Sequence, residues 1–281
     1  MNPGKYQVAQ MEIAWLSEWE SGSQEAKGRD VYHAGSGRVR EEWLSRCREE
    51  RALTADLMSD VASLSNLSAA ARRVISNGGS AGIDGMPTTK LKEWLLANHK
   101  SLTSSLLKGE YLPQLVRGVE IPKPNGGKRQ LGIPTVVDRL VQQAIHQVLE
   151  KRYDRTFSDH SYGFRQGRGC HPCIKQAGEY VSQGYRHIVD IDLAKFFDEV
   201  NHNRMLWLLS RRIGDKRLVK LIGRFLRSGM MQDGLTSQRI KGTPQGSPFT
   251  PPTQKVTLLI FPSQPPFCLY AMVNNNGIIS H

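Results

Sequence analysis

The sequence predicts an α+β fold, because helical and strand-like segments follow one another along the chain. An Asn-Gly turn at residues 125–126 separates two short strand-like runs, which is typical of a β-hairpin. An amphipathic helix is predicted over 138–153, where apolar residues recur with helical spacing. Apolar and acidic residues alternate within 185–193, which indicates a strand.

The chain before the hairpin is predicted to be mainly helical. Residues 1–45 are polar, and we expect a loose extension with a short helix at 11–19. Residues 41–76 are good helix formers, and a Gly-rich break precedes a second helix at 91–107. The apolar positions of the first segment are Leu53, Leu57, Val61 and Leu64. Those of the second are Leu91, Trp94, Leu95 and Leu102.

The hairpin strands are predicted at 116–121 and 128–133. After the strand at 185–193, helices are predicted at 204–212 and 217–227. No run of 18 apolar residues occurs, and the first 20 residues show no signal-peptide pattern. We therefore expect a cytoplasmic protein without a membrane partner.

The chain of 281 residues is strongly basic, with a net charge of +12 and an isoelectric point near 9.7. This balance favours a polyanionic partner, most often a nucleic acid. Residues 204–241 carry ten basic side chains against Asp215 and Asp233, a local charge of +8. Two interpretations stay open for this segment, a solvated helix face and a surface that contacts phosphates.

Four segments contain residues suited to nucleotide chemistry. Asp190 and Asp192 share one strand face, where carboxylates could bind Mg²⁺ or simply face solvent. The hairpin carries Lys123, Lys128 and Arg129, which could hold phosphates or form an ordinary basic surface.

Two further segments are loops. In 241–248, two glycines and two prolines surround Gln245, and the glycines would let a ligand approach the backbone. In 161–170, aromatic residues accompany Arg165 and Arg168, which suits stacking and phosphate contact or a buried helix entry. A Cys-x-x-Cys pair at Cys170 and Cys173 has no second pair to complete a zinc site, so we expect free or buried thiols.

Five blocks, in this order, resemble the reverse transcriptase domain encoded by group II introns. They are Gly82-Ile-Asp-Gly85, Lys128-Arg-Gln-Leu-Gly-Ile-Pro134, Ser161-Tyr-Gly-Phe-Arg165, Asp192 through Asp198, and Gly242-Thr-Pro-Gln-Gly-Ser-Pro248. The resemblance implies the fingers and part of the palm of a right-hand polymerase. The implied activity is RNA-directed DNA synthesis from dNTPs, with intron RNA as template, a DNA primer and a role in splicing.

The resemblance also implies roles for particular residues. Asp192 corresponds to the first catalytic, Mg²⁺-binding aspartate, and Phe197 to the aromatic residue that meets the incoming sugar. Lys123 and Arg129 resemble the residues that hold the triphosphate, and Gln245 the loop glutamine beside the nucleotide. Candidate nucleic-acid contacts are Lys128, Arg165, Arg168, Arg211, Arg212 and Lys216.

The sequence departs from the family pattern after Pro248. The family continues to an Asp-Asp hairpin, whereas no Asp or Glu follows Asp233 here, and residues 249–281 contain five prolines and one charged side chain. We expect a truncated or frameshifted copy whose metal site is incomplete and whose own polymerase activity is absent. The expected domains are an extension at 1–45, fingers and upper palm at 46–180, partial palm at 181–248 and an aberrant tail at 249–281.

Three alternatives stay open from the sequence. The chain could be a non-enzymatic RNA-binding remnant that keeps a basic groove. It could be a reverse transcriptase of another bacterial type, such as a retron. It could also be a pseudogene product that never folds.

Overall fold

The computed structural model describes residues 7–10, 45, 48–49, 51–122, 126, 128–163, 165–185, 187–190, 199–232 and 234–243. The chain divides into two compact units. The large unit comprises residues 36–155 and 196–261, and the small unit comprises 1–35, 156–195 and 262–281.

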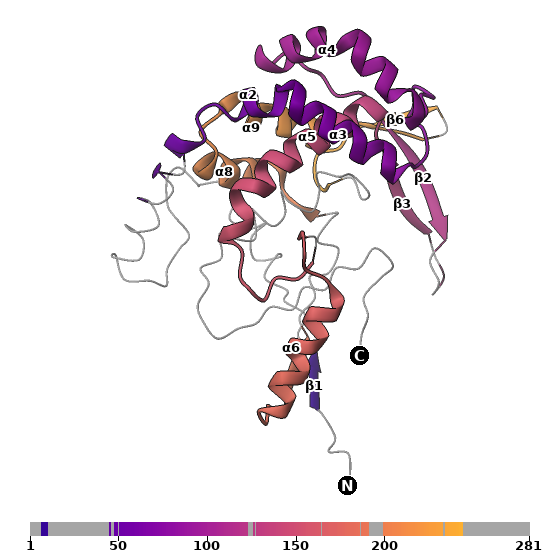
Figure 1. Cartoon of the computed structure of the whole chain (residues 1–281). Helices are drawn as coiled ribbons and strands as arrows, with labels where there is room; N and C mark the ends of the chain where they lie inside the picture. The colour runs from indigo at the N-terminus through magenta and orange to yellow at the C-terminus, as the bar shows by residue number, and fades with distance from the viewer. Residues whose placement is uncertain are drawn as a thin grey trace, which may run out of the picture. The chain divides into compact units, whose positions relative to one another are not determined.

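The large unit is built mainly from helices that bury one face each. In chain order they are α2 (Leu57–Ala62), α3 (Leu64–Asn77), the 3₁₀ turn η1 (Thr88–Lys90), α4 (Leu91–Leu107), α5 (Val136–Tyr153), α8 (His202–Arg212) and α9 (Lys216–Arg227). Helix α3 packs on α5, α8 packs on α9, and α4 lies across α2 and α3 (Figure 1). The helices predicted at 91–107, 138–153, 204–212 and 217–227 are confirmed, with ends within two residues of those expected.

Polar side chains define where four of these helices begin. Ser63, Thr135, Asn201 and Asp215 each accept a hydrogen bond from a backbone N–H in the first turn of the helix that follows. Such caps satisfy N–H groups that have no partner inside the helix. The caps explain why α5 starts two residues before the predicted position, because the capping residue Thr135 precedes the apolar pattern.

The helical core combines residues from α2, α3, α5 and α9. Its fully buried side chains include Leu57, Met58, Leu67, Leu140, Ile145, Leu149 and Leu218. Burying each such side chain contributes roughly 1.5–3 kcal/mol relative to leaving it in water. Removal of these apolar faces from water therefore supplies the main force that assembles the large unit.

The expected apolar face of residues 41–76 is only partly correct. Leu57 and Val61 are buried, but Leu53 and Leu64 are 72% and 56% exposed. The reason is that the segment is broken twice. A turn at residues 54–56 separates Leu53 from α2, and the extended backbone of Ser63, whose hydroxyl caps α3, separates α2 from α3. A single helical period does not continue through such a break.

A four-stranded sheet completes the large unit. Strands β2 (Val116–Pro122) and β3 (Lys128–Ile133) form the predicted hairpin, with Pro122 opposite Lys128. Strand β5 (Met230–Gln232) runs parallel to β2, and β6 (Leu235–Ser237) runs antiparallel to β5. Strands β5 and β6 were not predicted, because each is only three residues long. The Asp-Gly dipeptide ending at Gly234, whose φ is +79°, was the available signal.

The small unit contains helix α6 (Cys170–Ser182) and two short parallel strands, β1 (Gln7–Gln10) and β4 (His187–Asp190). Strand β4 lies within the predicted strand at 185–193, and β1 was not predicted. The helix expected at 11–19 lies outside the described residues, as does 191–198.

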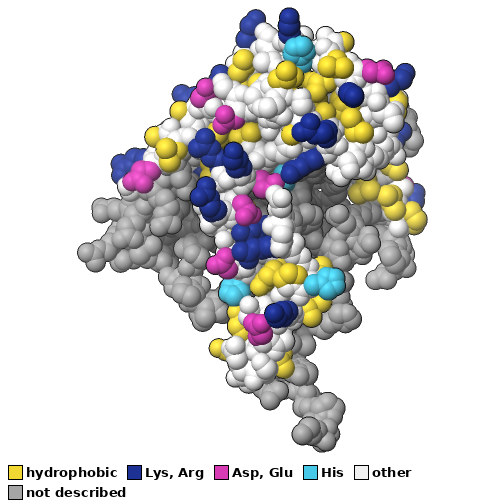
Figure 2. All heavy atoms as spheres, viewed as in Figure 1, with side chains coloured by type: hydrophobic (Ala, Val, Ile, Leu, Met, Phe, Trp, Pro, Cys, Tyr) yellow, Lys and Arg dark blue, Asp and Glu magenta, His cyan; other side chains and the backbone are white. Residues whose placement is uncertain are grey.

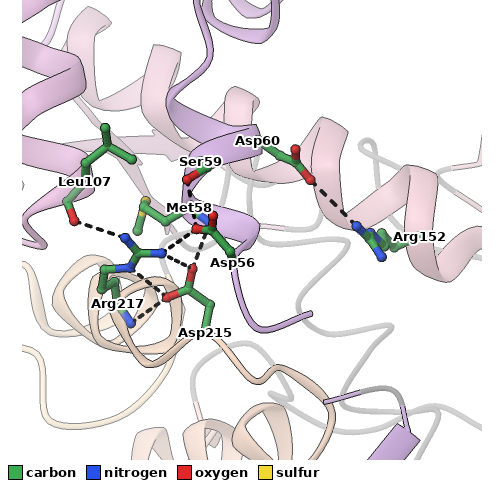
Figure 3. A network of polar contacts seen from close by, with 8 residues as sticks. All are labelled: Asp56, Met58, Ser59, Asp60, Leu107, Arg152, Asp215 and Arg217. Carbon is green, nitrogen blue, oxygen red and sulfur yellow. Dashed lines mark hydrogen bonds and ion pairs between the residues drawn. The ribbon is translucent and has the colours of Figure 1, made fainter. Parts of the chain in front are cut away.

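A buried carboxylate, Asp215, joins the start of α9 to the start of α2 (Figure 3). Its side chain is 2% exposed and accepts hydrogen bonds from the Met58 N–H at 2.8 Å and from Arg217 at 2.9 Å. Burial alone would raise the pKa of Asp215, but the hydrogen bonds from Arg217 and Met58 outweigh it and hold the pKa below its ordinary value. Arg217 also pairs with Asp56 at 2.5 Å and donates to the Leu107 carbonyl at 3.2 Å.

Replacement of Asp215 with alanine is expected to lower the free energy of unfolding by about 3 kcal/mol, because a cap and buried charged hydrogen bonds are lost together. Asp56→Ala is the matched control, since it also removes an Arg217 contact but at an exposed site, and should cost clearly less. Urea unfolding followed by circular dichroism measures both. Equal losses in the two variants would contradict the importance of the buried carboxylate.

The same pair predicts a pH dependence. The folded pKa of Asp215 lies below the ordinary value of 3.8, so its contribution is present above that pH and is lost as the pH falls through the folded pKa. The stability difference between the wild type and Asp215→Ala should therefore shrink in acid. A difference that grows as the pH falls below 3.8 would show that the sign is wrong.

Candidate nucleotide and nucleic-acid interface

Four of the residues predicted to handle the nucleotide lie outside the described part of the chain. They are Lys123, Asp192, Phe197 and Gln245. Arg129 lies in strand β3, where only the backbone is described. The described residues show instead how the segments that flank these positions are held.

The β2–β3 hairpin presents a polar ladder on one face. Lys128 pairs with Glu120 at 2.6 Å, and the Gln130 amide donates to Gln232 of β5 at 2.6 Å. The hydrogen bond from Lys128 is the main cause of a lowered pKa at Glu120. The hairpin is thereby tied to β5 through side chains as well as backbone. Lys128 is 73% exposed at its side chain, so the pair stays open to water.

The segment that joins β3 to the start of α5, residues 134–138, is called the hairpin exit here. It is held in place by a buried acid, Asp138. Its carboxylate accepts hydrogen bonds from the Tyr111 hydroxyl at 2.8 Å, the Thr135 hydroxyl at 2.8 Å and the Gln114 N–H at 3.1 Å. Burial raises the pKa of Asp138 despite these donors, and burial together with the Asp138 charge raises that of Tyr111. These contacts connect the start of α5 to the segment that leads into β2.

The Gly82–Gly85 block packs against the same hairpin exit. Gly82 is buried, and a Cβ at this position would lie 2.6 Å from the Thr135 Cα. The Arg139 guanidinium donates to the Gly78 carbonyl at 3.3 Å and to the Ser80 carbonyl at 2.7 Å. The Gly82–Gly85 block and the end of the Lys128–Pro134 block are therefore in contact within the large unit.

A second junction, which we call the loop junction, joins residues 199–202 to residues 241–242. Lys241 pairs with Glu199 at 2.7 Å and forms an antiparallel bridge with Asn201. The Gly242 N–H donates to the Val200 carbonyl at 2.8 Å, and His202 Nε2 lies 2.6 Å from the Gly242 carbonyl oxygen. The junction thus ties the residues that follow the Asp192–Asp198 block to the start of the Gly242–Pro248 block. Sequence reasoning missed His202, because a single histidine carries no pattern.

Several basic side chains of segment 204–241 already contact other groups within the protein. Arg217 is paired as described above, and Arg224 donates to the Gly109 and Tyr111 carbonyls at 2.7 Å. Arg212 is 7% exposed and lies over the Tyr153 ring at 4.8 Å, and Arg211 lies over the Trp207 ring at 4.7 Å. In Figure 2 the Lys and Arg side chains stand in small groups, several of them next to acidic side chains.

Lys216 and Lys220 differ from these arginines. Both are exposed on α9, and neither forms an ion pair with the residues that the structure describes. They are the side chains of this segment best suited to meet phosphates. Nucleic-acid contact by Arg211, Arg212 and Lys216 stays a prediction.

In the small unit, Arg165 and Arg168 brace the loop before α6. Arg165 is 8% exposed, donates to the Ser158 and Ser161 carbonyls at 2.7 and 3.1 Å, and lies 5.6 Å from the Phe157 ring. Arg168 pairs with Asp159 at 3.0 Å. Both arginines therefore have a structural function, and their contact with nucleic acid stays a prediction.

The Cys-x-x-Cys pair forms the start of α6, with an exposed free thiol at Cys170 and a buried one at Cys173. Burial raises the pKa of the Cys173 thiol, which makes it less reactive. In the described ranges, no group of three or more His, Cys, Asp or Glu side chains could hold a metal ion. The predicted ligand Asp192 is not in those ranges. No described helix is long and apolar enough to cross a membrane.

A family model described as reverse transcriptase (RNA-dependent DNA polymerase) matches residues 121–262, about half of the chain. The matched span begins at the penultimate residue of β2 and includes β3 and the loop junction. The chain belongs to the reverse transcriptase family. Members of this family bind RNA templates and use divalent metal ions.

Individual relatives of this reverse transcriptase chain point to introns. Protein YkfC of Escherichia coli (strain K12) is 34% identical over 198 residues, which cover 68% of this chain and 52% of that protein. The group II intron-encoded protein LtrA of Lactococcus lactis is 37% identical over 153 residues, or 54% of this chain and 25% of LtrA. The putative COX1/OXI3 intron 1 protein of Saccharomyces cerevisiae is 32% identical over 151 residues, or 53% of this chain and 18% of that protein.

These relatives confirm the resemblance to group II intron reverse transcriptases and maturases, and the family match confirms the reverse transcriptase fold. The chain spans about half the length of YkfC and a quarter of the length of LtrA. Activity, substrates and partners therefore belong to the proposal below.

Gly82→Ala is expected to lower the free energy of unfolding of this reverse transcriptase chain by about 3 kcal/mol, because the new Cβ collides with backbone that has no room to move. Gly85→Ala is the control. Gly85 has a φ of +67° and nothing within 4 Å of a Cβ, so only backbone strain of about 1 kcal/mol is expected there. Thermal and urea unfolding compare the two variants. A larger loss in Gly85→Ala would contradict the proposed packing.

Proposed function

We propose that the chain forms the fingers and part of the palm of an RNA-directed DNA polymerase of the group II intron type. Its substrates would be a primed RNA template and dNTPs. The observation that carries the proposal is the loop junction, because it holds the flanks of two family blocks, Asp192–Asp198 and Gly242–Pro248, against each other.

The hairpin supports the same proposal. Strands β2 and β3 run to a tight turn at Gly126, whose φ is +83°, and β2 is tied to β5 along its first residues. The contact with β5 fixes the base of the hairpin and so the direction of β2 and β3. In the proposed function, Lys123 and Arg129 hold the triphosphate of the incoming nucleotide by ionic hydrogen bonds, which suit phosphate oxygens.

The proposed chemistry needs divalent metal ions. Asp192 would supply one carboxylate ligand for Mg²⁺, which prefers oxygen ligands. Nucleotidyl transfer of this kind uses two metal ions about 4 Å apart, held by carboxylates from more than one strand. No Asp or Glu follows Asp233 in the sequence, so we propose that the chain by itself binds its substrates without joining them.

The chain is expected to bind a primed RNA template with an affinity that falls steeply as salt rises. Replacing Lys216 and Lys220 with alanine should weaken binding and reduce the slope of log Kd against log salt by about 2, because each lysine neutralises one phosphate. Fluorescence anisotropy with labelled RNA measures both quantities.

The charge-matched control replaces Lys92 and Lys100, two exposed lysines of α4. This control should leave the slope close to that of the wild type. If the two double variants lose affinity equally, the effect reflects net charge alone and α9 is not a binding surface.

With Mg²⁺, dNTPs and a primed RNA template, no primer extension is expected from the chain. With Ca²⁺ in place of Mg²⁺, the next complementary dNTP should slow dissociation of the primed RNA, and a mismatched dNTP should not. Asp192→Ala should remove that discrimination, because Asp192 would supply a carboxylate ligand to the divalent ion that accompanies the triphosphate.

Stopped-flow dissociation and gel-based extension assays measure these outcomes. Extension that Asp192→Ala abolishes would show that the chain is catalytically complete. RNA binding without any effect of the complementary dNTP would instead favour an RNA-binding remnant.

A further inference from the structure

His202 is a buried polar side chain to which the proposed chemistry assigns no task. It is 3% exposed, at the first residue of α8, and its Nε2 lies 2.6 Å from the Gly242 carbonyl oxygen. A carbonyl oxygen can only accept a hydrogen bond, so His202 Nε2 must carry the proton. The structure therefore fixes which ring nitrogen donates.

The surroundings of His202 favour the neutral imidazole. Burial lowers the pKa of His202 and outweighs the opposite effect of the Gly242 hydrogen bond, and the positive charges of Arg227 and Arg239 lower it further. The N-terminal position on α8 acts in the same direction, because the helix dipole is positive there. The hydrogen bond is thus a neutral one at ordinary pH, with the proton held on Nε2.

Both hydrogen-bonding groups of Gly242 are tied to the same short segment. Its N–H donates to the Val200 carbonyl at 2.8 Å, and its C=O accepts from His202 two residues later. Gly242 has a φ of +80°, a conformation that few other residues adopt without strain. Because both peptide groups around Gly242 are held, the direction in which the chain leaves Gly242 is set at this residue.

We propose that His202 is a positioning residue, which aims the Gly242–Pro248 loop by donating from Nε2 to the Gly242 carbonyl. This inference rests on the proposed function, in which Gln245 of that loop lies beside the incoming nucleotide. His202 itself does not touch the nucleotide. Its effect is to fix how the chain leaves Gly242, and loss of that constraint should weaken discrimination among nucleotides.

Three substitutions separate this role from general packing. His202→Gln places an amide N–H at the distance of Nε2 from the backbone, so it can replace the hydrogen bond. His202→Asn places its amide near the position of Nδ1, where it cannot reach, and His202→Phe keeps a ring without any donor. Hydrogen exchange detected by mass spectrometry on the full chain measures how firmly each segment is held.

In the Asn and Phe variants, peptides that contain Gly242 and Gln245 should exchange about tenfold faster, while those from α3 and α5 should not change, because only the loop is released. The Gln variant should exchange like the wild type. Wild-type exchange in the Asn and Phe variants, or equally fast exchange in Gln, would overturn the inference. Faster exchange throughout the large unit would overturn it too, because the residue would then merely support the fold.

The rate at which primed RNA dissociates in the presence of dNTP tests whether the loop position matters for nucleotide binding. With Ca²⁺ and a primed RNA, the slowing of dissociation by the complementary dNTP should fall about tenfold in the Asn and Phe variants and persist in Gln. Binding of RNA without dNTP should not change. If the wild type shows no dNTP effect, the proposed function fails and the nucleotide part of this inference falls with it. The exchange pattern still decides whether His202 holds the loop.

Discussion

The large unit depends on one buried carboxylate, Asp215, which holds two distant parts of the chain together. It caps α9 and at the same time accepts the backbone N–H of Met58 in α2, 157 residues earlier in the sequence. Thr54 reinforces the contact, since its hydroxyl donates to the Arg212 carbonyl at 3.0 Å and accepts from the Gly214 N–H at 2.9 Å. Helix α8 packs on α9, so the position of α8 relative to α2 and α5 follows from this contact. Residues 199–202 of the loop junction lead directly into α8, so the position of the junction follows from that of α8.

The same arrangement changes how the positive charge of the chain is understood. A run of ten basic residues looks like a surface for phosphates, but several of its arginines are used inside the protein. Arg217 neutralises two aspartates, Arg224 satisfies carbonyls beyond the end of α4, and Arg212 covers a tyrosine ring. A guanidinium can do this because its five donors reach several acceptors at once. Lys216 and Lys220 of α9 lack that fork and are exposed, and neither forms an ion pair with another described residue.

The sequence predicted those parts of the fold that local patterns determine. The hairpin follows from its Asn-Gly turn, and α4 and α5 follow from apolar spacing, because each of these signals lies within a few residues. The break at Ser63 was missed because its cause is a single hydroxyl. The contact between Asp215 and Met58 and the contact between His202 and Gly242 could not be predicted, because neither leaves a local pattern. The charges of Arg165 and Arg212 are evident from the sequence, but their burial depends on packing between distant residues and could not be predicted.

Among the described residues, the contacts that hold the flanks of the candidate site are made by side chains other than those to which the resemblance assigns metal binding. The loop junction is made from Glu199, Val200, Asn201 and His202 on one side and Lys241 and Gly242 on the other. The hairpin exit is made from Asp138 and its donors, and Asp138 is far too enclosed to serve a metal. Because these contacts are backbone hydrogen bonds, a neutral histidine and buried or paired side chains, they need no bound cation to form. These contacts therefore hold the flanks of the Asp192–Asp198 and Gly242–Pro248 blocks together, whereas nucleotide binding, in the proposed function, would depend on Asp192 as well.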